Sequence, residues 1–173
     1  MNVSVLRTFP FLNAFSDEEL VDLFGQATEQ VFPPGTLLCK EGERDDHLYF
    51  LLSGEVEIAK KDADGQPHVL ARLSSGTLLG ELAWVMNTPC TTTIKVLRET
   101  AAIQLNGAAL TQQMQERSPG AFKLSTALLR LLAGRLLRMN DQFLALQTKA
   151  NGNGHKKGEI ERLRERILHD WSF

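Results

Sequence analysis

The sequence predicts a mainly β domain with flanking helices, in which a small antiparallel β-roll or jelly roll occupies the middle of the chain. Residues 31–105 form short runs rich in Val, Ile, Leu and Thr, which glycines separate at the spacing of hairpin turns. Several runs alternate apolar and polar side chains, as strands with one buried face do. A helix-start signal precedes these runs, and a long proline-free helical pattern follows them.

A short N-terminal helix is predicted to begin after Ser16. Ser16 and Glu19 form a capping box, in which each side chain satisfies a free backbone donor at the helix start. Leu20, Leu23 and Phe24 follow at helical spacing, so this helix has an apolar stripe to bury.

Six strands are predicted from the runs rich in Val, Ile, Leu and Thr, and several of them alternate apolar and polar residues. Val56 and Ile58, for example, lie among charged neighbours, which indicates one buried and one solvated face. The pair Asp64–Gly65 is a hairpin turn signal between the third and fourth strands. The predicted strands are 36–40, 47–53, 55–61, 68–73, 92–98 and 101–105.

A long helix is predicted to begin at Ser118–Pro119, an N-cap residue followed by proline at the first helical position. Its apolar residues recur in alternating steps of three and four, with further apolar residues beside them, so one stripe can face the roll and another a partner. We expect this helix to mediate a homodimer. The alternative is that its whole apolar surface packs on the roll of the same chain. The predicted dimer contacts are Leu129, Leu132, Leu136, Met139 and Phe143.

Three segments are predicted along the chain: residues 1–148 form the roll with its closing helix, 149–158 a flexible polar linker, and 159–173 an amphipathic tail helix. So short a helix is marginal alone and needs a surface, which is either its own roll or a protein partner. The apolar face of this tail consists of Ile160, Leu163, Ile167 and Trp171.

Composition limits the partners and the location. The 173 residues are 43% hydrophobic and 23% charged, as in one globular domain. The net charge of −2 lacks the positive field that nucleic-acid binding needs, and no apolar run is long enough for a membrane helix. Arg7 and Pro10 interrupt the N-terminal apolar stretch, so no signal peptide is expected. We therefore expect a cytoplasmic protein without nucleic-acid or membrane partners.

The two cysteines, Cys39 and Cys90, are far apart in the sequence and form no C-x-x-C pair. They are too few for a zinc site or a disulfide framework, which favours a reducing compartment. We expect Cys90 to be buried and inert, and a redox-active thiol is the alternative. The four histidines contain no H-x-H pair, so no metal site is predicted.

The densest local motif is Gly80-Glu81-Leu82-Ala83, followed by residues 87–93. A glycine-opened turn can begin a short helix whose free backbone N–H groups bind an anion, and Glu81 can accept hydrogen bonds from sugar hydroxyls. A purely structural corner is the alternative interpretation.

These segments resemble the cyclic nucleotide-binding domains of catabolite activator protein and of the regulatory subunits of cyclic AMP-dependent protein kinase. The resemblance extends over residues 9–147 and implies an eight-stranded antiparallel β-roll with N- and C-terminal helices. In this resemblance the segment around Gly80–Ala83 corresponds to the family's phosphate-binding cassette, which covers residues 76–93 here. The matching segments are 11–20, 34–43, 46–56, the cassette and the long closing helix.

The resemblance also implies roles for individual residues. Gly80, Leu82 and Ala83 become backbone donors to a phosphate, and Glu81 becomes the acceptor for the ribose 2′-hydroxyl. The family's arginine, which pairs with the phosphate oxygens, would follow Thr88–Pro89, where this chain has Cys90. Thr91 follows and offers a hydroxyl. The basic residues considered as replacements are Arg72, Arg98 and Arg130.

The sequence therefore predicts a non-enzymatic regulatory and signalling module that acts through protein–protein contacts of its C-terminal helices. No cofactor is expected, and no catalytic motif such as G-x-S-x-G, Walker A or H-E-x-x-H is present. The chain beyond the long helix is too short for a helix-turn-helix domain, so DNA binding is not implied. The alternative is a sensor with a retuned pocket for cyclic AMP, cyclic GMP or a cyclic dinucleotide.

Overall fold

The computed structural model describes residues 2–151 of the chain. The chain divides into two units, Met1–Leu128 and Leu129–Phe173. The long final helix continues through this division to Asn151, so residues 149–151 of the predicted linker are helical. The rest of that linker and the predicted tail helix lie outside the described residues.

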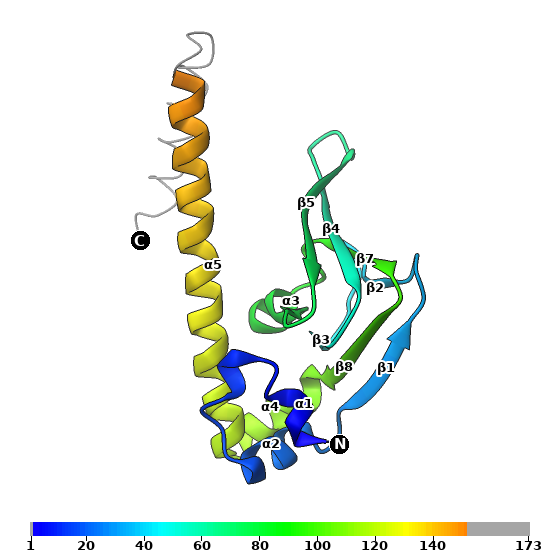
Figure 1. The fold of residues 1–173 in the computed structure, drawn as a ribbon, viewed down its shortest axis with the longest axis vertical. Helices are drawn as coiled ribbons and strands as arrows, with labels where there is room; N and C mark the ends of the chain where they lie inside the picture. The colour runs from blue at the N-terminus through cyan, green and yellow to red at the C-terminus, as the bar shows by residue number, and fades with distance from the viewer. Residues whose placement is uncertain (1, 152–173) are drawn as a thin grey trace. The chain divides into compact units, whose positions relative to one another are not determined.

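Eight antiparallel strands form two four-stranded sheets, which confirms the predicted fold class (Figure 1). The first sheet has the order β1-β8-β3-β6 and the second the order β2-β7-β4-β5. The strands are β1 (Thr28–Phe32), β2 (Leu37–Cys39), β3 (His47–Leu51), β4 (Glu55–Lys61), β5 (Pro67–Ser74), β6 (Leu78–Leu79), β7 (Thr93–Arg98) and β8 (Thr100–Asn106).

Two strands, β1 and β6, were not among the six that the sequence predicts. Four of the five residues of β1 are exposed and only Phe32 is buried, so the strand has no apolar alternation to read. β6 has two residues, both buried, which is too short for a periodic signal.

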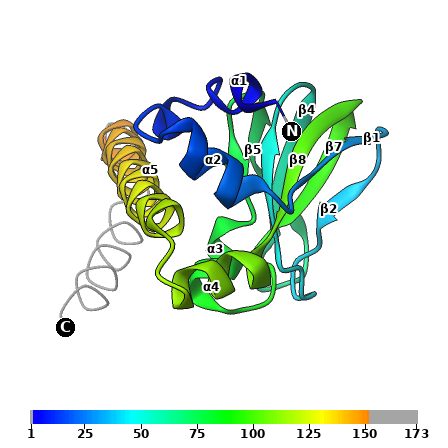
Figure 2. The same cartoon turned by 90° about the horizontal axis from the view of Figure 1, so that it is seen from below.

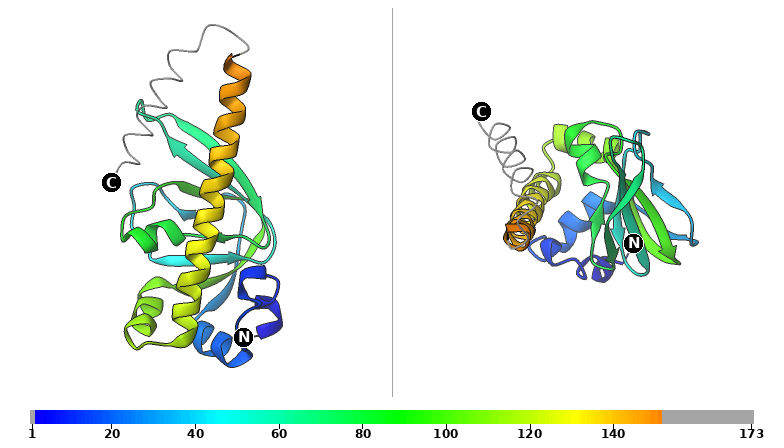
Figure 3. Two further views of the ribbon diagram at one scale, coloured as in Figure 1. Left: turned by 90° about the vertical axis from the view of Figure 1, so that its left-hand side faces the viewer. Right: turned by 90° about the horizontal axis from the view of Figure 1, so that it is seen from above.

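In the first unit α1, α2 and α4 lie together at one end of the roll, and α3 lies farther along it (Figures 1 and 3). The capping box is confirmed, because the Glu19 amide donates to Ser16 Oγ and the Ser16 amide donates to the Glu19 carboxylate. In Figure 2, α2 runs beside the strands with α1 and α4 on either side of it. The helical elements are α1 (Val3–Leu6), η1 (Pro10–Leu12), α2 (Asp17–Phe24), α3 (Glu81–Met86), α4 (Gly107–Gln115) and α5 (Pro119–Asn151).

Strand β3 contributes to two cores. Tyr49 and Leu51 belong to the apolar cluster inside the roll. Phe50 faces the helices, since its ring lies 5.4 Å from that of Phe9 and 5.0 Å from that of Phe24. Successive side chains of a strand point to opposite faces, so β3 forms a wall shared by the roll and the helical layer.

The second unit is described through the part of α5 that follows Leu128. Several of its apolar side chains are exposed, as a surface that could meet a partner requires. Within residues 2–151, none of the helices combines the length and the hydropathy needed to traverse a bilayer. The large apolar side chains that are exposed in the described residues of this part of α5 include Leu129, Leu136, Leu137, Met139 and Leu144.

Candidate functional site

Gly80 opens the turn between β6 and α3, and its position requires a glycine for two reasons. Its φ of 83° lies in the left-handed region. A Cβ atom at this residue would lie 2.3 Å from the carbonyl oxygen of His47. The turn therefore approaches the backbone of β3 more closely than any side chain would allow.

The first turn of α3 contains three further residues of the predicted site. Glu81 is 3% exposed and Ala83 is 7% exposed, so both side chains are directed into the protein. Leu82 is partly exposed on the outer face of the helix, together with Val85 and Met86. The turn thus combines a buried carboxylate with backbone N–H groups at a helix start, as the motif predicts.

Trp84 fastens this helix to the next one and was missed by sequence reasoning. Its indole Nε1 donates to the carbonyl oxygen of Gly107, at 2.9 Å, and to Thr111 Oγ1, at 3.1 Å. A Cβ atom on Gly107 would lie 2.6 Å from Trp84 Cδ1. The glycine thus makes room for the indole, a match between distant residues that no local motif reveals.

The cassette loop, residues 87–92, follows α3 and is held by a second loop. Asn87 ends the helix in a left-handed conformation, with φ of 49°. The Cys90 amide donates to the Glu43 carbonyl oxygen, and the Gly42 amide donates to the Cys90 carbonyl oxygen, both at 2.9 Å. Thr91 follows and is half-buried. Backbone hydrogen bonds to the loop of Gly42 and Glu43 therefore hold the segment that contains Cys90 and Thr91.

Cys39 and Cys90 form a disulfide, and the prediction of two unpaired cysteines was wrong. Their Cα atoms are 6.2 Å apart, within the range that a disulfide spans. The pairing follows from sheet topology, because Cys39 lies opposite Ile94 of β7, just after the cassette loop. The chain has no free thiol, so the cysteines no longer support a reducing compartment.

The family model of the cyclic nucleotide-binding domain matches residues 29–117, which include both sheets and the cassette. The chain belongs to this family.

Relatives of this cyclic nucleotide-binding domain include regulatory proteins. A CRP-like cAMP-activated global transcriptional regulator of Mycobacterium tuberculosis is 32% identical over 115 residues, 66% of this chain and 50% of that protein. The N-terminal domain of a transcriptional regulator from Streptomyces coelicolor is 33% identical, with a TM-score of 0.60 over 80% of this chain and 93% of that one. The chain spans about half the length of the Mycobacterium regulator.

A solved cyclic nucleotide-binding domain from Methylobacillus flagellatus has the same fold. Its TM-score is 0.74, and the match covers 83% of this chain and 84% of that one at 23% sequence identity. At this identity the likeness establishes the fold alone. Together with the family match, it accounts for the eight-stranded roll and its flanking helices.

Two arginines considered as substitutes for the family's phosphate-pairing residue are engaged elsewhere in the cyclic nucleotide-binding domain. Arg72 contacts the Glu57 carboxylate across the β4–β5 hairpin, with Nη2 to Oε2 at 3.0 Å. Arg98 Nε lies 3.3 Å from Glu55 Oε2. Both guanidinium groups are well exposed, which is typical of a solvated sheet face. The third, Arg130, belongs to the second unit.

A polar cluster lies at the start of β3, beside the Gly80 turn. The Tyr49 hydroxyl donates to Asp45 Oδ2 at 2.9 Å, and His47 Nδ1 lies 2.7 Å from Asp45 Oδ1. Burial, and then the neighbouring Asp45 carboxylate, raise the pKa of Tyr49 well above its ordinary value. Tyr49 therefore remains a protonated hydrogen-bond donor, and the cluster fixes the strand against which Gly80 packs.

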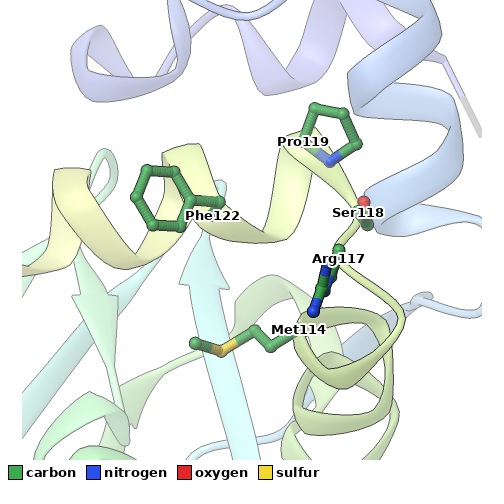
Figure 4. Close-up of a pocket in the computed structure, with 5 residues that line it drawn as sticks. All are labelled: Met114, Arg117, Ser118, Pro119 and Phe122. Carbon is green, nitrogen blue, oxygen red and sulfur yellow. The ribbon is translucent and has the colours of Figure 1, made fainter.

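A pocket of about 360 Å³ lies at the turn between α4 and α5 (Figure 4). It contains none of the predicted site residues. In the part of the chain that the structure describes, no group of three or more His, Cys, Asp and Glu side chains is arranged to hold a metal ion. The pocket is lined by Met114, Arg117, Ser118, Pro119 and Phe122.

Proposed function

We propose that this cyclic nucleotide-binding domain is a non-enzymatic regulatory module that acts through protein–protein contacts and binds cyclic mononucleotides only weakly. The observation that carries the proposal is Cys90, at the position where the family resemblance places an arginine. A disulfide sulfur has no charge and no hydrogen to donate, whereas arginine gives phosphate a bidentate, charge-assisted contact.

The missing cation has a large effect on affinity. A desolvated phosphate without its cation costs about 3 to 5 kcal/mol, which is roughly two to three and a half decades in the dissociation constant. The Glu81 side chain, which is 3% exposed in the same turn, supplies no cation in its place. The ion pairs of Arg72 and Arg98 on the sheet surface support the view that neither serves as the replacement.

The alternative is a sensor for cyclic AMP, cyclic GMP or a cyclic dinucleotide. Family membership and the left-handed Gly80 turn favour it, because the first N–H groups of a helix have no partners within that helix and this turn places them at the start of α3. In that case Gly80, Leu82 and Ala83 would donate to the phosphate, Glu81 would accept from the ribose, and Thr91 would supply a hydroxyl. Ligand binding would then shift the population of helix conformations.

Titration calorimetry with cyclic AMP, cyclic GMP and a cyclic dinucleotide distinguishes the two functions. The degenerate pocket predicts no heat at micromolar ligand and, at most, binding in the millimolar range. Saturable heat at micromolar ligand would overturn it. Glu81→Ala serves as the matched variant, because heat that survives this substitution does not come from the cassette.

The exposed apolar stripe of α5 supports a homodimer as the first protein contact. Leu129 is 65% exposed, Leu136 46% and Met139 64%, so this stripe is open in the single chain. The other predicted contacts, Leu132 and Phe143, are half-buried on the same helix. Light scattering should give twice the chain mass for the wild type and the chain mass for Leu136→Glu with Met139→Glu.

The control for the dimer is Gln142→Glu, which places one charge on an exposed polar position of α5. It should leave the mass doubled. A monomeric wild type at high protein concentration would refute the dimer.

The second proposed contact is the tail, with Ile160, Leu163, Ile167 and Trp171, which lies outside the described residues. Truncation after Asn151 tests whether it serves a partner. A tail that contacts another protein leaves the melting temperature of the roll nearly unchanged when removed. A large drop would show that the tail packs on its own roll.

A further inference from the structure

We propose that the Cys39–Cys90 disulfide is a site of reversible thiol–disulfide exchange with a dithiol, and that its redox state sets the order of the cassette loop. This loop belongs to the site of the proposed function. The effect of the redox state on ligand or partner binding depends on the proposed function. The thiol–disulfide exchange does not, because it is inferred from the position of the disulfide.

The disulfide joins an edge strand to a loop, and both cysteines contribute to the apolar cluster inside the roll. Cys39 is the last residue of β2, a three-residue strand at the edge of its sheet that pairs with β7 alone. The register of this pairing shifts between Leu37 and Cys39, so the ladder is irregular beside the disulfide. Cys90 lies in the cassette loop rather than in a strand or helix.

Local opening can expose the disulfide, although it is buried in the closed state. Cys39 is 6% exposed and Cys90 is 3% exposed. The hydrogen bonds of the Cys90 backbone go to Gly42 and Glu43, which belong to another loop. Short edge strands and loops open with less free energy than a core strand does, so a reductant can reach these sulfurs without unfolding β3 or β8.

The exchange is balanced with a dithiol as the reductant. One thiolate of the dithiol attacks a sulfur of the disulfide, forms a mixed disulfide and displaces the other cysteine as a thiolate, which takes a proton. The second thiol of the dithiol then attacks the mixed disulfide and releases the remaining cysteine. Two electrons and two protons pass to Cys39 and Cys90, and the dithiol becomes a disulfide.

Reduction leaves the loop with weaker attachments. The two backbone bonds of Cys90 remain, together with the Glu41 amide that donates to Thr93 Oγ1 at 3.1 Å. The loop also caps α3, because the Thr88 amide donates to the Ala83 carbonyl oxygen at 3.0 Å. When the cassette binds a ligand or a protein partner, a loosened loop must become ordered, which costs conformational entropy. Reduction therefore lowers the affinity of this site.

The test measures thiol release from the full-length protein in dithiothreitol, beside global unfolding followed by circular dichroism. We expect thiols to appear at least about ten times faster than the chain unfolds, since local opening precedes global unfolding. Hydrogen exchange in residues 87–92 should rise by about the same factor while β3 stays protected. Thiol release no faster than unfolding would make the disulfide a structural staple and overturn the inference.

Two variants separate the cross-link from the side chains. Cys39→Ser and Cys90→Ser each remove the disulfide, but only Cys90 lies in the cassette loop. Both should reproduce the fast exchange of the reduced wild type in residues 87–92. If either keeps the slow exchange of the oxidised wild type, the cross-link does not order the loop. These readouts need no nucleotide, so they stay valid if calorimetry rejects the proposed function.

Discussion

The indole nitrogen of Trp84 donates a hydrogen bond to the Gly107 carbonyl oxygen at 2.9 Å and thereby fastens α3 to the first residue of α4. The Gly107 amide in turn donates to the Asp46 carbonyl oxygen at 2.6 Å. One side chain therefore links the cassette helix to the helix that leads into Pro119 and α5. A displacement of α3 can reach α4 through this contact.

Trp84→Phe should lower the free energy of unfolding by at least about 1 kcal/mol, because it removes both the shared N–H donor to Gly107 and Thr111 and one ring of the indole. The loss is limited because the Gly107 oxygen also accepts from Thr111 Oγ1 at 2.8 Å. Urea unfolding measures the change, and hydrogen exchange should quicken in both α3 and α4. The matched control is Val85→Ala on the same helix, whose side chain is 47% exposed. Equal effects on exchange in α4 from both variants would refute the link.

Gly80→Ala should destabilise the protein by more than about 2 kcal/mol, because it adds a close contact to an unfavourable φ. Gly76 is the matched control: its φ of 80° is similar, but a Cβ there has nothing within 4 Å. Gly76→Ala should therefore cost only about 1 kcal/mol, the conformational part. The difference between the two losses of unfolding free energy, measured with denaturant, gives the cost of the clash between the new Cβ and the His47 carbonyl oxygen. Similar losses would mean that the β6–α3 turn can move away from β3.

Cys90→Arg should bind cyclic AMP more tightly than Cys90→Ser, by about 3 kcal/mol or roughly a hundredfold. The serine variant is the proper reference because both substitutions remove the disulfide. The two cysteines are 51 residues apart, and without the disulfide this loop is no longer closed in the unfolded chain. Either substitution should therefore lower the free energy of unfolding by about 2 to 4 kcal/mol. Calorimetry gives the affinities. Equal affinities would show that the pocket differs from the family's in more than this residue.

The contact between Glu19 and Lys123 should make stability depend on acid pH. Lys123 donates to the Glu19 carboxylate, and with the Ser16 amide it holds the pKa of Glu19 below its ordinary value of 4.5. Because the pKa of Glu19 is lower in the folded state, its carboxylate stabilises the fold at pH values above the ordinary pKa of 4.5. This contribution is lost as the pH falls through the lowered pKa of the folded state. The stability difference between the wild type and Lys123→Met should therefore shrink on acidification.

Urea unfolding at several pH values between 7 and about 3 tests this expectation. Lys123→Arg is the control, because it keeps the positive charge and should keep the pH dependence. A difference between wild type and Lys123→Met that stays constant with pH would attribute the effect of Lys123 to its packing over the Phe15 ring, 5.9 Å away.

The fold was predictable from the sequence wherever the signal is local. The Ser16–Glu19 capping box depends on neighbouring residues and appears in the structure. The alternation in β4 appears only in part, because Val56 is buried whereas Ile58 is half-buried like its neighbours. β1 was missed because tertiary pairing with β8, rather than an apolar pattern, makes it a strand. α4 was missed too, although Asn106 caps it by accepting from the Ala108 and Ala109 amides.

The candidate site shows the same division. The Gly80 turn could be located because a glycine followed by an acidic residue and apolar residues is a local pattern. The disulfide could not, because its formation depends on the register that places Cys39 opposite Ile94. The bond from Trp84 to Gly107 likewise joins residues 23 positions apart, and nothing in either neighbourhood indicates the other.

The shared wall formed by β3 has a consequence for how the first unit melts. Phe50 packs on Phe9 and Phe24, while Tyr49 and Leu51 pack inside the roll. Neither layer can lose its structure without exposing one face of the same strand, so the two are thermodynamically coupled. Scanning calorimetry of this unit should record one cooperative endotherm, with equal calorimetric and van't Hoff enthalpies.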